Sequence, residues 1–284
     1  MPHRLSFRIV AALVIVMALG GFRSATSLFA PEAEPWPRWE AHDATNDAVI
    51  DFTAWDRLLK RYVKAGPNGL ALFDYGAVSS ADKAALKGFI DGLAALPISR
   101  YARPQQQAYW INLYNALTVD VVLQHYPVDS IRDIDISPGF FADGPWGKKL
   151  VAVEGEDLSL NEIEHRILRP IWQDPRLHYA VNCASIGCPD LAREAYTGAR
   201  MEAQLDAAAR GYINNWRGVS VKGGAIVVSS IYDWFYDDFG GSDAALMAHL
   251  RQYAEPVLIA QLGAVEAPED TQYDWSLNDA KSAR

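Results

Sequence analysis

Both cysteines of the chain lie in one short stretch, HYAVNCASIGCPDL, which spans residues 178–191. His178 opens the stretch, and Cys183 and Cys188 follow with four residues between them. Thiols near an imidazole can form a structural disulfide, hold a metal ion, or supply a nucleophile that works with a general base. The sequence therefore places a candidate chemical site in this stretch and leaves three kinds of site open.

Two of these interpretations are not catalytic. A disulfide between Cys183 and Cys188 would close a small loop and stabilise the fold by on the order of 2 kcal/mol, so its role would be to fix a corner of a binding module. A zinc site would combine both cysteines with His178 and His165, but their spacing matches none of the usual zinc motifs. Zinc binding stays an alternative, and we predict no resident cofactor.

The position of His178 on a predicted strand decides whether its imidazole can reach a thiol. RLHYAVNC is typical of a buried strand over 177–182, and side chains alternate between the two faces of a strand. Because His178 and Cys183 are five residues apart, they meet only if the chain turns at Cys183. His165, from the helix predicted before this strand, is an alternative general base.

The residue that follows Cys188 favours this thiol as the nucleophile. Pro189 suits the first turn of a helix, which would place Cys188 at the helix N-terminus. A helix N-terminus lowers the pKa of a thiol and favours the reactive thiolate. We therefore predict a cysteine-dependent hydrolase or acyl transferase that acts on a peptide or amide, with Cys188 as nucleophile and Cys183 as the alternative.

The longest predicted helix is PQQQAYWINLYNALTVDVVLQHY, residues 104–126. It is apolar almost all round, so we expect it in the middle of the domain with other elements on every side. Asn112 and Asn115 lie on one face and are predicted to be buried amides that need partners. They either bond the backbone of neighbouring loops or line a binding site.

Shorter elements surround this helix. The sequence SLNEIEHRIL carries a capping box of Ser159 and Glu162, and VSVKGGAIVVSS is typical of a hairpin that turns at two glycines. We predict an α+β fold in which the apolar central helix packs on a small, mainly antiparallel sheet. The other predicted helices are at 48–66, 80–96, 199–215, 231–239, 242–254 and 256–263, and the other extended segments are at 70–78, 150–153 and 272–278.

The first residues indicate export. Positive charges precede the uncharged apolar run at 9–22, and small residues follow it, which is the order of a secretory signal cleaved near 25–27. The run is short for a membrane span, and the alternative is an uncleaved anchor in a bacterial inner membrane. In both cases we expect the domain in the periplasm or outside the cell, where cysteine pairs oxidise.

Composition and charge exclude several classes of protein. The chain has 284 residues, of which 50% are hydrophobic and 21% charged, as in an ordinary folded protein. A net charge of -9 argues against a nucleic-acid partner, because binding phosphates requires clustered Lys and Arg. A protein or peptide ligand remains, and membrane contact is predicted only through the N-terminal anchor. The predicted division is a signal peptide or anchor at 1–27, a linker at 28–50, one domain at 51–278 and a tail at 279–284.

Five motifs together resemble the family known as domain of unknown function 547. They are AYWINLYNALTV, LSLNEIEHRILR, HYAVNCASIGCPDL, YDWFYDDFG and the final QYDWSLN. The resemblance spans about residues 51–278, which is why we predict one domain rather than two. This family has no established activity, so the resemblance implies a fold and no reaction.

The family is similar, distantly, to the papain and transglutaminase group. That similarity implies a central helix, then a strand with the catalytic histidine, then a further strand whose Asp or Asn orients the imidazole. His178 would be that histidine, and Asp274 or Asn278 the orienting residue. The central helix carries no cysteine at its start, so either the nucleophile has moved to the 178–191 stretch or the domain binds without catalysis.

Overall fold

The computed structural model describes residues 31–139 and 143–281. The predicted signal peptide or anchor at 1–27 lies outside these ranges. Within them, no helix combines the length and the apolar character that a membrane span requires. The fold is α+β, as predicted, with eight α-helices and seven strands in the described part of the chain.

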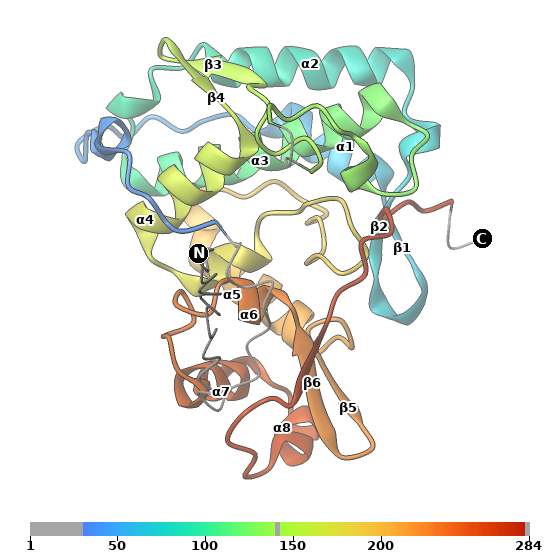
Figure 1. Cartoon of the computed structure of the whole chain (residues 1–284). Helices are drawn as coiled ribbons and strands as arrows, with labels where there is room; N and C mark the ends of the chain where they lie inside the picture. Colours follow the sequence, from blue (N-terminus) through green and yellow to red (C-terminus); the bar gives the residue numbers. More distant parts are fainter. Residues whose placement is uncertain (1–30, 140–142, 282–284) are drawn as a thin grey trace, which may run out of the picture.

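The longest helix, α3 (Arg103–His125), forms the centre of the upper part of the molecule in Figure 1. It is buried at 106–119 and 121–123, which agrees with its apolar character on every side. Helix α2 (Ser80–Ala94) packs on α3, and α1 (Thr53–Tyr62) packs on α2. The predicted helix at 80–96 is confirmed as α2, and the Ser79 hydroxyl caps its start by accepting a hydrogen bond from the Asp82 amide.

The lower part of the molecule contains the α-helices that follow residue 200 and a second hydrophobic core. The predicted capping box of Ser159 and Glu162 is confirmed. Ser159 Oγ accepts a hydrogen bond from the Glu162 amide at 3.3 Å, and Glu162 Oε2 accepts one from the Ser159 amide at 2.9 Å. This pair precedes a π-helix at Glu162–Leu168. The remaining α-helices are α4 (Arg169–Trp172), α5 (Met201–Ile213), α6 (Ile231–Trp234), α7 (Asp243–Tyr253) and α8 (Pro256–Leu262).

The strands form three small sheets in the described residues. Two are antiparallel pairs, β1 (Val63–Ala65) with β2 (Ala71–Phe73) and β3 (Val151–Val153) with β4 (Glu156–Leu158). The third contains β5 (Val219–Lys222), β6 (Ala225–Ser229) and β7 (Asp270–Gln272). The predicted hairpin is confirmed, since β5 and β6 join through Gly223 and Gly224, whose φ angles are 61° and 95°.

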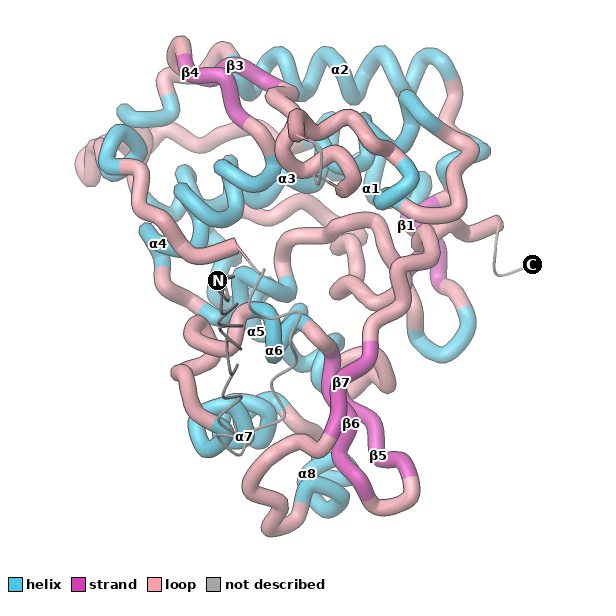
Figure 2. Tube along the Cα trace, in the orientation of Figure 1, coloured by secondary structure: helices cyan, strands magenta, loops and turns pink. Residues whose placement is uncertain are grey.

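The C-terminal segment connects the two parts of the molecule, as the tube in Figure 2 shows. It starts in the lower part as β7, parallel to β6, and continues upward towards β1 and β2. On the way Leu277 pairs with Ser185 and Asp279 pairs with Phe73. The predicted extended segment at 272–278 is therefore confirmed, and it lies against the cysteine stretch.

Two predicted local structures around the cysteines are wrong. The expected strand at 177–182 is a 3-10 turn, Pro175–Tyr179, followed by irregular chain, because the Asp174 carboxylate caps the turn and proline suits its start. The expected helix after Cys188 is absent from this described segment. There the Asn182 side chain bonds the Pro189 carbonyl at 2.7 Å and holds the chain in an irregular path.

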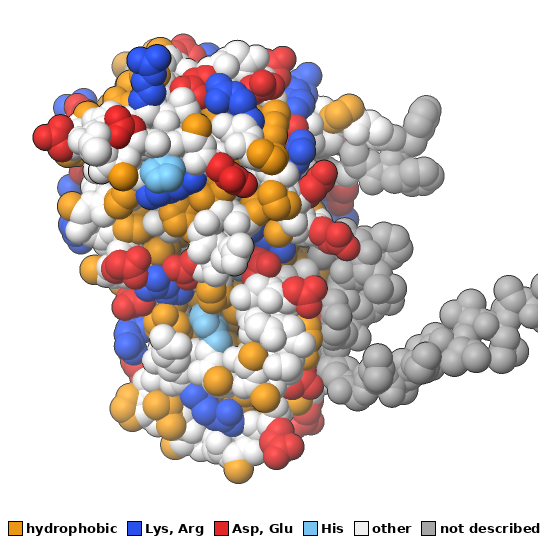
Figure 3. Space-filling view, turned by 90° about the vertical axis from the view of Figure 1, so that its left-hand side faces the viewer, with side chains coloured by type: hydrophobic (Ala, Val, Ile, Leu, Met, Phe, Trp, Pro, Cys, Tyr) orange, Lys and Arg blue, Asp and Glu red, His pale blue; other side chains and the backbone are white. Residues whose placement is uncertain are grey.

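The segment before residue 51 packs on the core. In the predicted linker at 28–50, Trp39 is buried and its ring packs edge-on against Trp110 at 5.0 Å, so the core includes this residue. The predicted helix at 231–239 is shorter, since α6 ends at Trp234 and turns follow. On the face in Figure 3, basic, acidic and hydrophobic side chains are interspersed over the described residues.

Candidate functional site

A cavity of about 560 Å³ lies where α3, the π-helix, the cysteine stretch, α6 and the C-terminal segment meet. Cavities of this size are typical of small-molecule and substrate sites. Four of the predicted catalytic side chains line it, namely Cys183, Cys188, His165 and His178. The structure therefore brings together the thiols and imidazoles that the sequence had singled out.

The π-helix presents His165 to this cavity. π-Helical turns are rare and often occur at functional sites. His165 Nδ1 lies 3.0 Å from Nη1 of Arg169, one turn later. Because a guanidinium can only donate, Nδ1 is the acceptor, and the proton of the neutral ring is on Nε2. Burial, together with the positive charges of Arg169 and His178, lowers the pKa of His165 to about 4, so the ring is neutral at pH 7.

His178 is oriented by a carboxylate that the sequence analysis missed. Its Nε2 donates to Asp238 Oδ2 at 2.7 Å, and its ring stacks on Phe235 at 4.2 Å. Arg169 bonds the same carboxylate through Nε at 2.6 Å and Nη2 at 3.1 Å. Burial raises the pKa of Asp238, but the bonds from His178 and Arg169 outweigh burial and hold it well below its ordinary value. The second imidazole nitrogen, Nδ1, faces Glu164 Oε1 at 3.9 Å.

The two thiols differ in exposure and in the direction of their pKa shifts. Both are free in the structure; Cys183 is half-buried and Cys188 is buried. The pKa of Cys183 is lowered because the Cys188 thiol and the hydroxyls of Ser185 and Tyr273 donate to its sulfur, against the effect of burial. Burial, and then the neighbouring Cys183, raise the pKa of Cys188. Of the two thiols, Cys183 is therefore the one whose surroundings favour the thiolate, whereas the sequence analysis favoured Cys188.

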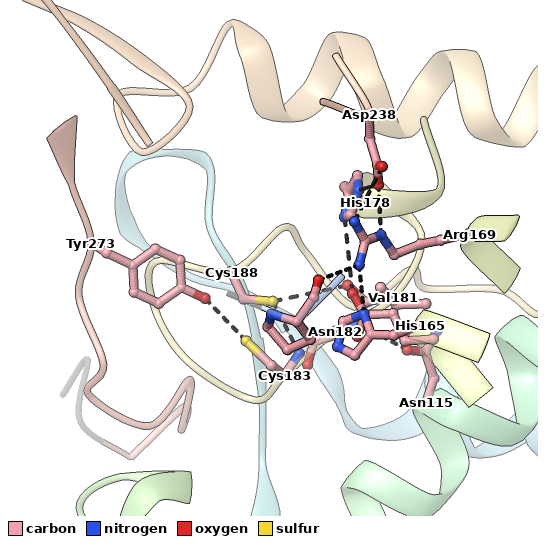
Figure 4. A network of polar contacts seen from close by, with 12 residues as sticks. Asn115, His165, Arg169, His178, Val181, Asn182, Cys183, Cys188, Asp238 and Tyr273 are labelled. Carbon is pink, nitrogen blue, oxygen red and sulfur yellow. Dashed lines mark hydrogen bonds and ion pairs between the residues drawn. The ribbon is translucent and has the colours of Figure 1, made fainter. Parts of the chain in front are cut away.

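Tyr273 comes from the C-terminal segment and points its hydroxyl towards Cys183 (Figure 4). The Tyr273 oxygen lies 3.0 Å from Cys183 Sγ and 2.9 Å from Ser185 Oγ, while Ser185 Oγ lies 3.4 Å from the same sulfur. These three groups form a triangle of neutral donors and acceptors. Among the residues described, no hydrogen bond joins either thiol to an imidazole, so the thiols and the histidines form two separate polar groups along one cavity.

The structure contains neither of the non-catalytic arrangements that the sequence allowed. Cys183 and Cys188 are close, since the Cys183 amide donates to Cys188 Sγ at 3.0 Å, but they are not bridged. The described residues include no group of three or more His, Cys, Asp or Glu arranged to hold a metal ion. His165 and His178 instead bond to Arg169 and Asp238.

Asn112 and Asn115 are buried, as predicted, and the side chains of both form hydrogen bonds with backbone groups. Asn115 donates to the Ala180 carbonyl at 2.9 Å and accepts from the Asn182 amide at 2.8 Å. Asn112 makes the equivalent pair with Tyr196, at 2.8 and 3.0 Å. The first of the two alternatives for these amides is therefore observed, and they fix the chain before Cys183 and after Cys188.

Asp274 does not orient an imidazole. Its side chain is exposed and accepts from the Ser276 amide at 2.9 Å, while its carbonyl accepts from the Gly187 amide at 2.7 Å. Asn278 is buried and accepts from the Tyr75 hydroxyl. The prediction fails because the last segment of the chain passes beside the cysteines, whereas the turn after α6 carries Asp238 to His178. An acidic pair inside the aromatic YDWFYDDFG motif was the available signal.

Fold and site together define an α+β domain with a cavity lined by two thiols and two imidazoles. Residues 98–213 match the family described as a protein of unknown function, DUF547, so the predicted resemblance is confirmed over this segment. The matched segment includes α3, the π-helix and the cysteine stretch, and it ends before Asp238 and Tyr273. No curated protein and no solved structure matches the chain. The similarity to the papain and transglutaminase group stays a prediction.

Proposed function

We propose that this chain is a cysteine-dependent hydrolase or acyl transferase that acts on a peptide or amide carbonyl, with Cys183 as the nucleophile. The observation that carries the proposal is the Cys183 sulfur itself. It is half-buried, it lines a cavity large enough for a substrate, and hydrogen-bond donors lower its pKa. Thiolates held in this way attack carbonyl carbons at neutral pH.

In the proposed reaction the Cys183 thiolate adds to the carbonyl carbon, and the carbonyl oxygen takes the electron pair of the double bond. The adduct collapses, the carbon–nitrogen bond breaks, and the leaving amine takes a proton from His178. Water or an acceptor amine then attacks the resulting thioester and gives its proton back to His178. The carbon–sulfur bond breaks and the Cys183 thiolate is restored.

The two histidines suit different roles in this reaction. His178 Nε2 is bonded to Asp238, which leaves Nδ1, 3.9 Å from the Glu164 carboxylate, for proton transfer. His165 is neutral at pH 7 with its proton on Nε2, so it can donate a hydrogen bond to the negative oxygen of the adduct.

Acylation by an activated ester tests the proposal. The protein is mixed with p-nitrophenyl acetate, and peptide mapping by mass spectrometry locates the acetyl group. We expect stoichiometric acetylation of Cys183, its loss in Cys183→Ala, and a slower loss of the acetyl group in His178→Gln. A Cys188→Ala variant should still be acetylated, at a lower rate. Absence of acetylation in the unmodified protein, or equal acetylation in Cys183→Ala, would overturn the nucleophile assignment.

We also propose that the activity is exported. The order of charged, apolar and small residues at 1–27 supports this location. N-terminal sequencing of the protein from the cell envelope should find a chain that begins after residues 25–27. Retention of Met1 in a membrane-bound protein would contradict cleavage and support the anchor.

A further inference from the structure

Four aromatic side chains form a wall of the cavity, and of these the proposed reaction uses only the Tyr273 hydroxyl. The wall consists of Trp146, Trp234, Tyr273 and Trp275, all of which line the cavity. Trp275 is at its centre, with the Tyr273 ring at 4.6 Å, Trp234 at 5.6 Å and Trp146 at 5.8 Å. Each of the four rings is only partly buried, so ring surface remains for a ligand.

The permanently charged groups among the described lining residues of the cavity have one sign, whereas His178, 3.9 Å from Glu164, is positive only when it is protonated. Among its described lining residues, Glu164 and Asp143 carry carboxylates, and none is a Lys or Arg. The Glu164 side chain is 11% exposed, so its charge acts through a medium that screens poorly. His165 is neutral at pH 7 and adds no positive charge. Arg169 lies behind the histidines and is paired with Asp238.

Two aromatic rings that line the cavity already contact cations. The Arg132 guanidinium lies over Trp275 at 5.3 Å, and Arg169 lies over Phe235 at 4.7 Å. Both distances are within the range in which a cation is attracted to the negative face of a ring. A cation that enters the cavity would meet further faces of this kind together with a buried carboxylate.

We infer that the cavity selects a substrate with a cationic group, an ammonium or a guanidinium, beside the carbonyl that Cys183 attacks. Glu164 is the residue that determines this selectivity, and the aromatic wall holds the apolar stem of the cationic group. The inference rests on the proposed function, because it needs Cys183 to be reactive. It adds the charge of the substrate, which the geometry of the thiols alone does not give.

Charge-matched thiol reagents test this inference. The probes are methanethiosulfonates with a trimethylammonioethyl, a methyl or a sulfonatoethyl group, which share one reactive centre. Their rate constants at Cys183, followed by peptide mapping, are divided by the rate constants with 2-mercaptoethanol. We expect the cationic reagent to exceed the anionic one by at least about tenfold after this normalisation, as electrostatic attraction into a charged cleft allows.

Two variants locate the source of the preference. Glu164→Gln should reduce the normalised ratio by at least about threefold, because it removes the buried charge and keeps the shape. Glu255→Gln removes the same charge from an exposed site before α8 and should leave the ratio unchanged. If Glu164→Gln fails to fold, the ratio in the unmodified protein should instead fall as salt is raised.

The outcomes separate this inference from the proposed function. Reactive Cys183 with a normalised ratio near one, or an equal effect of Glu255→Gln, would overturn the cationic substrate and leave the nucleophile in place. Reaction of Cys183 that is slower than that of 2-mercaptoethanol with all three reagents at neutral pH would overturn the nucleophile, and the inference with it.

Discussion

The thiol end and the imidazole end of the cavity are held by different kinds of interaction. At the thiol end, Cys183 contacts neutral groups, of which the Tyr273 hydroxyl at 3.0 Å is the closest side-chain oxygen. At the imidazole end, His178 contacts Asp238, whose charge is paired with buried Arg169. The reactivity of the thiol and the stability of the fold therefore depend on different groups. Neutral hydrogen-bond donors lower the pKa of the Cys183 thiol, whereas ion pairs stabilise the structure around the histidines.

The largest expected effect on stability comes from breaking the ion pair at the imidazole end of the cavity. Asp238→Asn would leave Arg169, which is 7% exposed, as a buried charge without a counter-ion. We expect the free energy of unfolding to fall by about 3–5 kcal/mol, as measured by urea denaturation. Asp237→Asn changes the exposed neighbour and should stay within about 0.5 kcal/mol of the unmodified protein. Equal stability of the two variants would show that water screens the pair.

The pH dependence of the free energy of unfolding tests the imidazole end of the cavity through His165. Burial lowers the pKa of His165 from an ordinary 6.5 to about 4, so between these values the unfolded chain binds a proton that the folded protein does not. Stability should therefore fall as the pH drops from about 6.5 to about 4, by about 3 kcal/mol for this group. His249, whose pKa burial also lowers to about 4, adds to the slope in the same direction.

His165→Gln should reduce this slope, whereas replacement of the exposed His42 by Gln should not. The measurement is the free energy of unfolding at several pH values between 4 and 7 for the three proteins. A slope that is the same in all three would contradict the assignment of a buried, neutral His165.

A smaller effect is expected from the amides that fix the cysteine stretch. Asn115→Leu would leave the Ala180 carbonyl and the Asn182 amide without partners, and Asn112→Leu would do the same to Tyr196. We expect each change to lower the free energy of unfolding by about 1–3 kcal/mol. Gln124→Leu, at an exposed position of the same helix, is the control and should have little effect.

The smallest effect is expected at the thiol end of the cavity, where the hydrogen-bond donors are neutral. Tyr273→Phe removes one donor from the Cys183 sulfur and should raise the pKa of the thiol. Alkylation of Cys183 by iodoacetamide at pH 6 should then slow by about threefold, within the range of one hydrogen bond. Tyr253→Phe removes a hydroxyl that bonds Asp206 instead and should leave the rate unchanged. Equal alkylation rates in all three proteins would show that the Tyr273 hydroxyl does not lower the pKa of the Cys183 thiol.

Much of the fold could be predicted because its signals are local. Helix α3 has a continuous apolar pattern, the β5–β6 hairpin has two glycines in its turn, and the Ser159 and Glu162 pair has the spacing of a capping box. Each of these signals is contained in a few consecutive residues. The strand expected at 177–182 was wrong because a short apolar run also suits a buried 3-10 turn.

The site could be predicted only in part, since its partners are distant in the chain. The histidines and cysteines stood out by residue type. Asp238 is 60 residues from His178, and Tyr273 is 90 residues from Cys183, so only tertiary structure brings them together. The choice of Cys188 depended on a helix that the structure does not form, and the choice of Asp274 on the order of elements in another group of proteins.

The pH profile of Cys183 alkylation, measured in the unmodified protein and in His178→Gln, tests the central claim most directly. If neutral donors hold the thiolate, the apparent pKa should lie below about 8.5, the value of a free thiol, and His178→Gln should leave it almost unchanged. An apparent pKa of 8.5 or above, or a rate at pH 6 that falls more in His178→Gln than in Tyr273→Phe, would contradict the account.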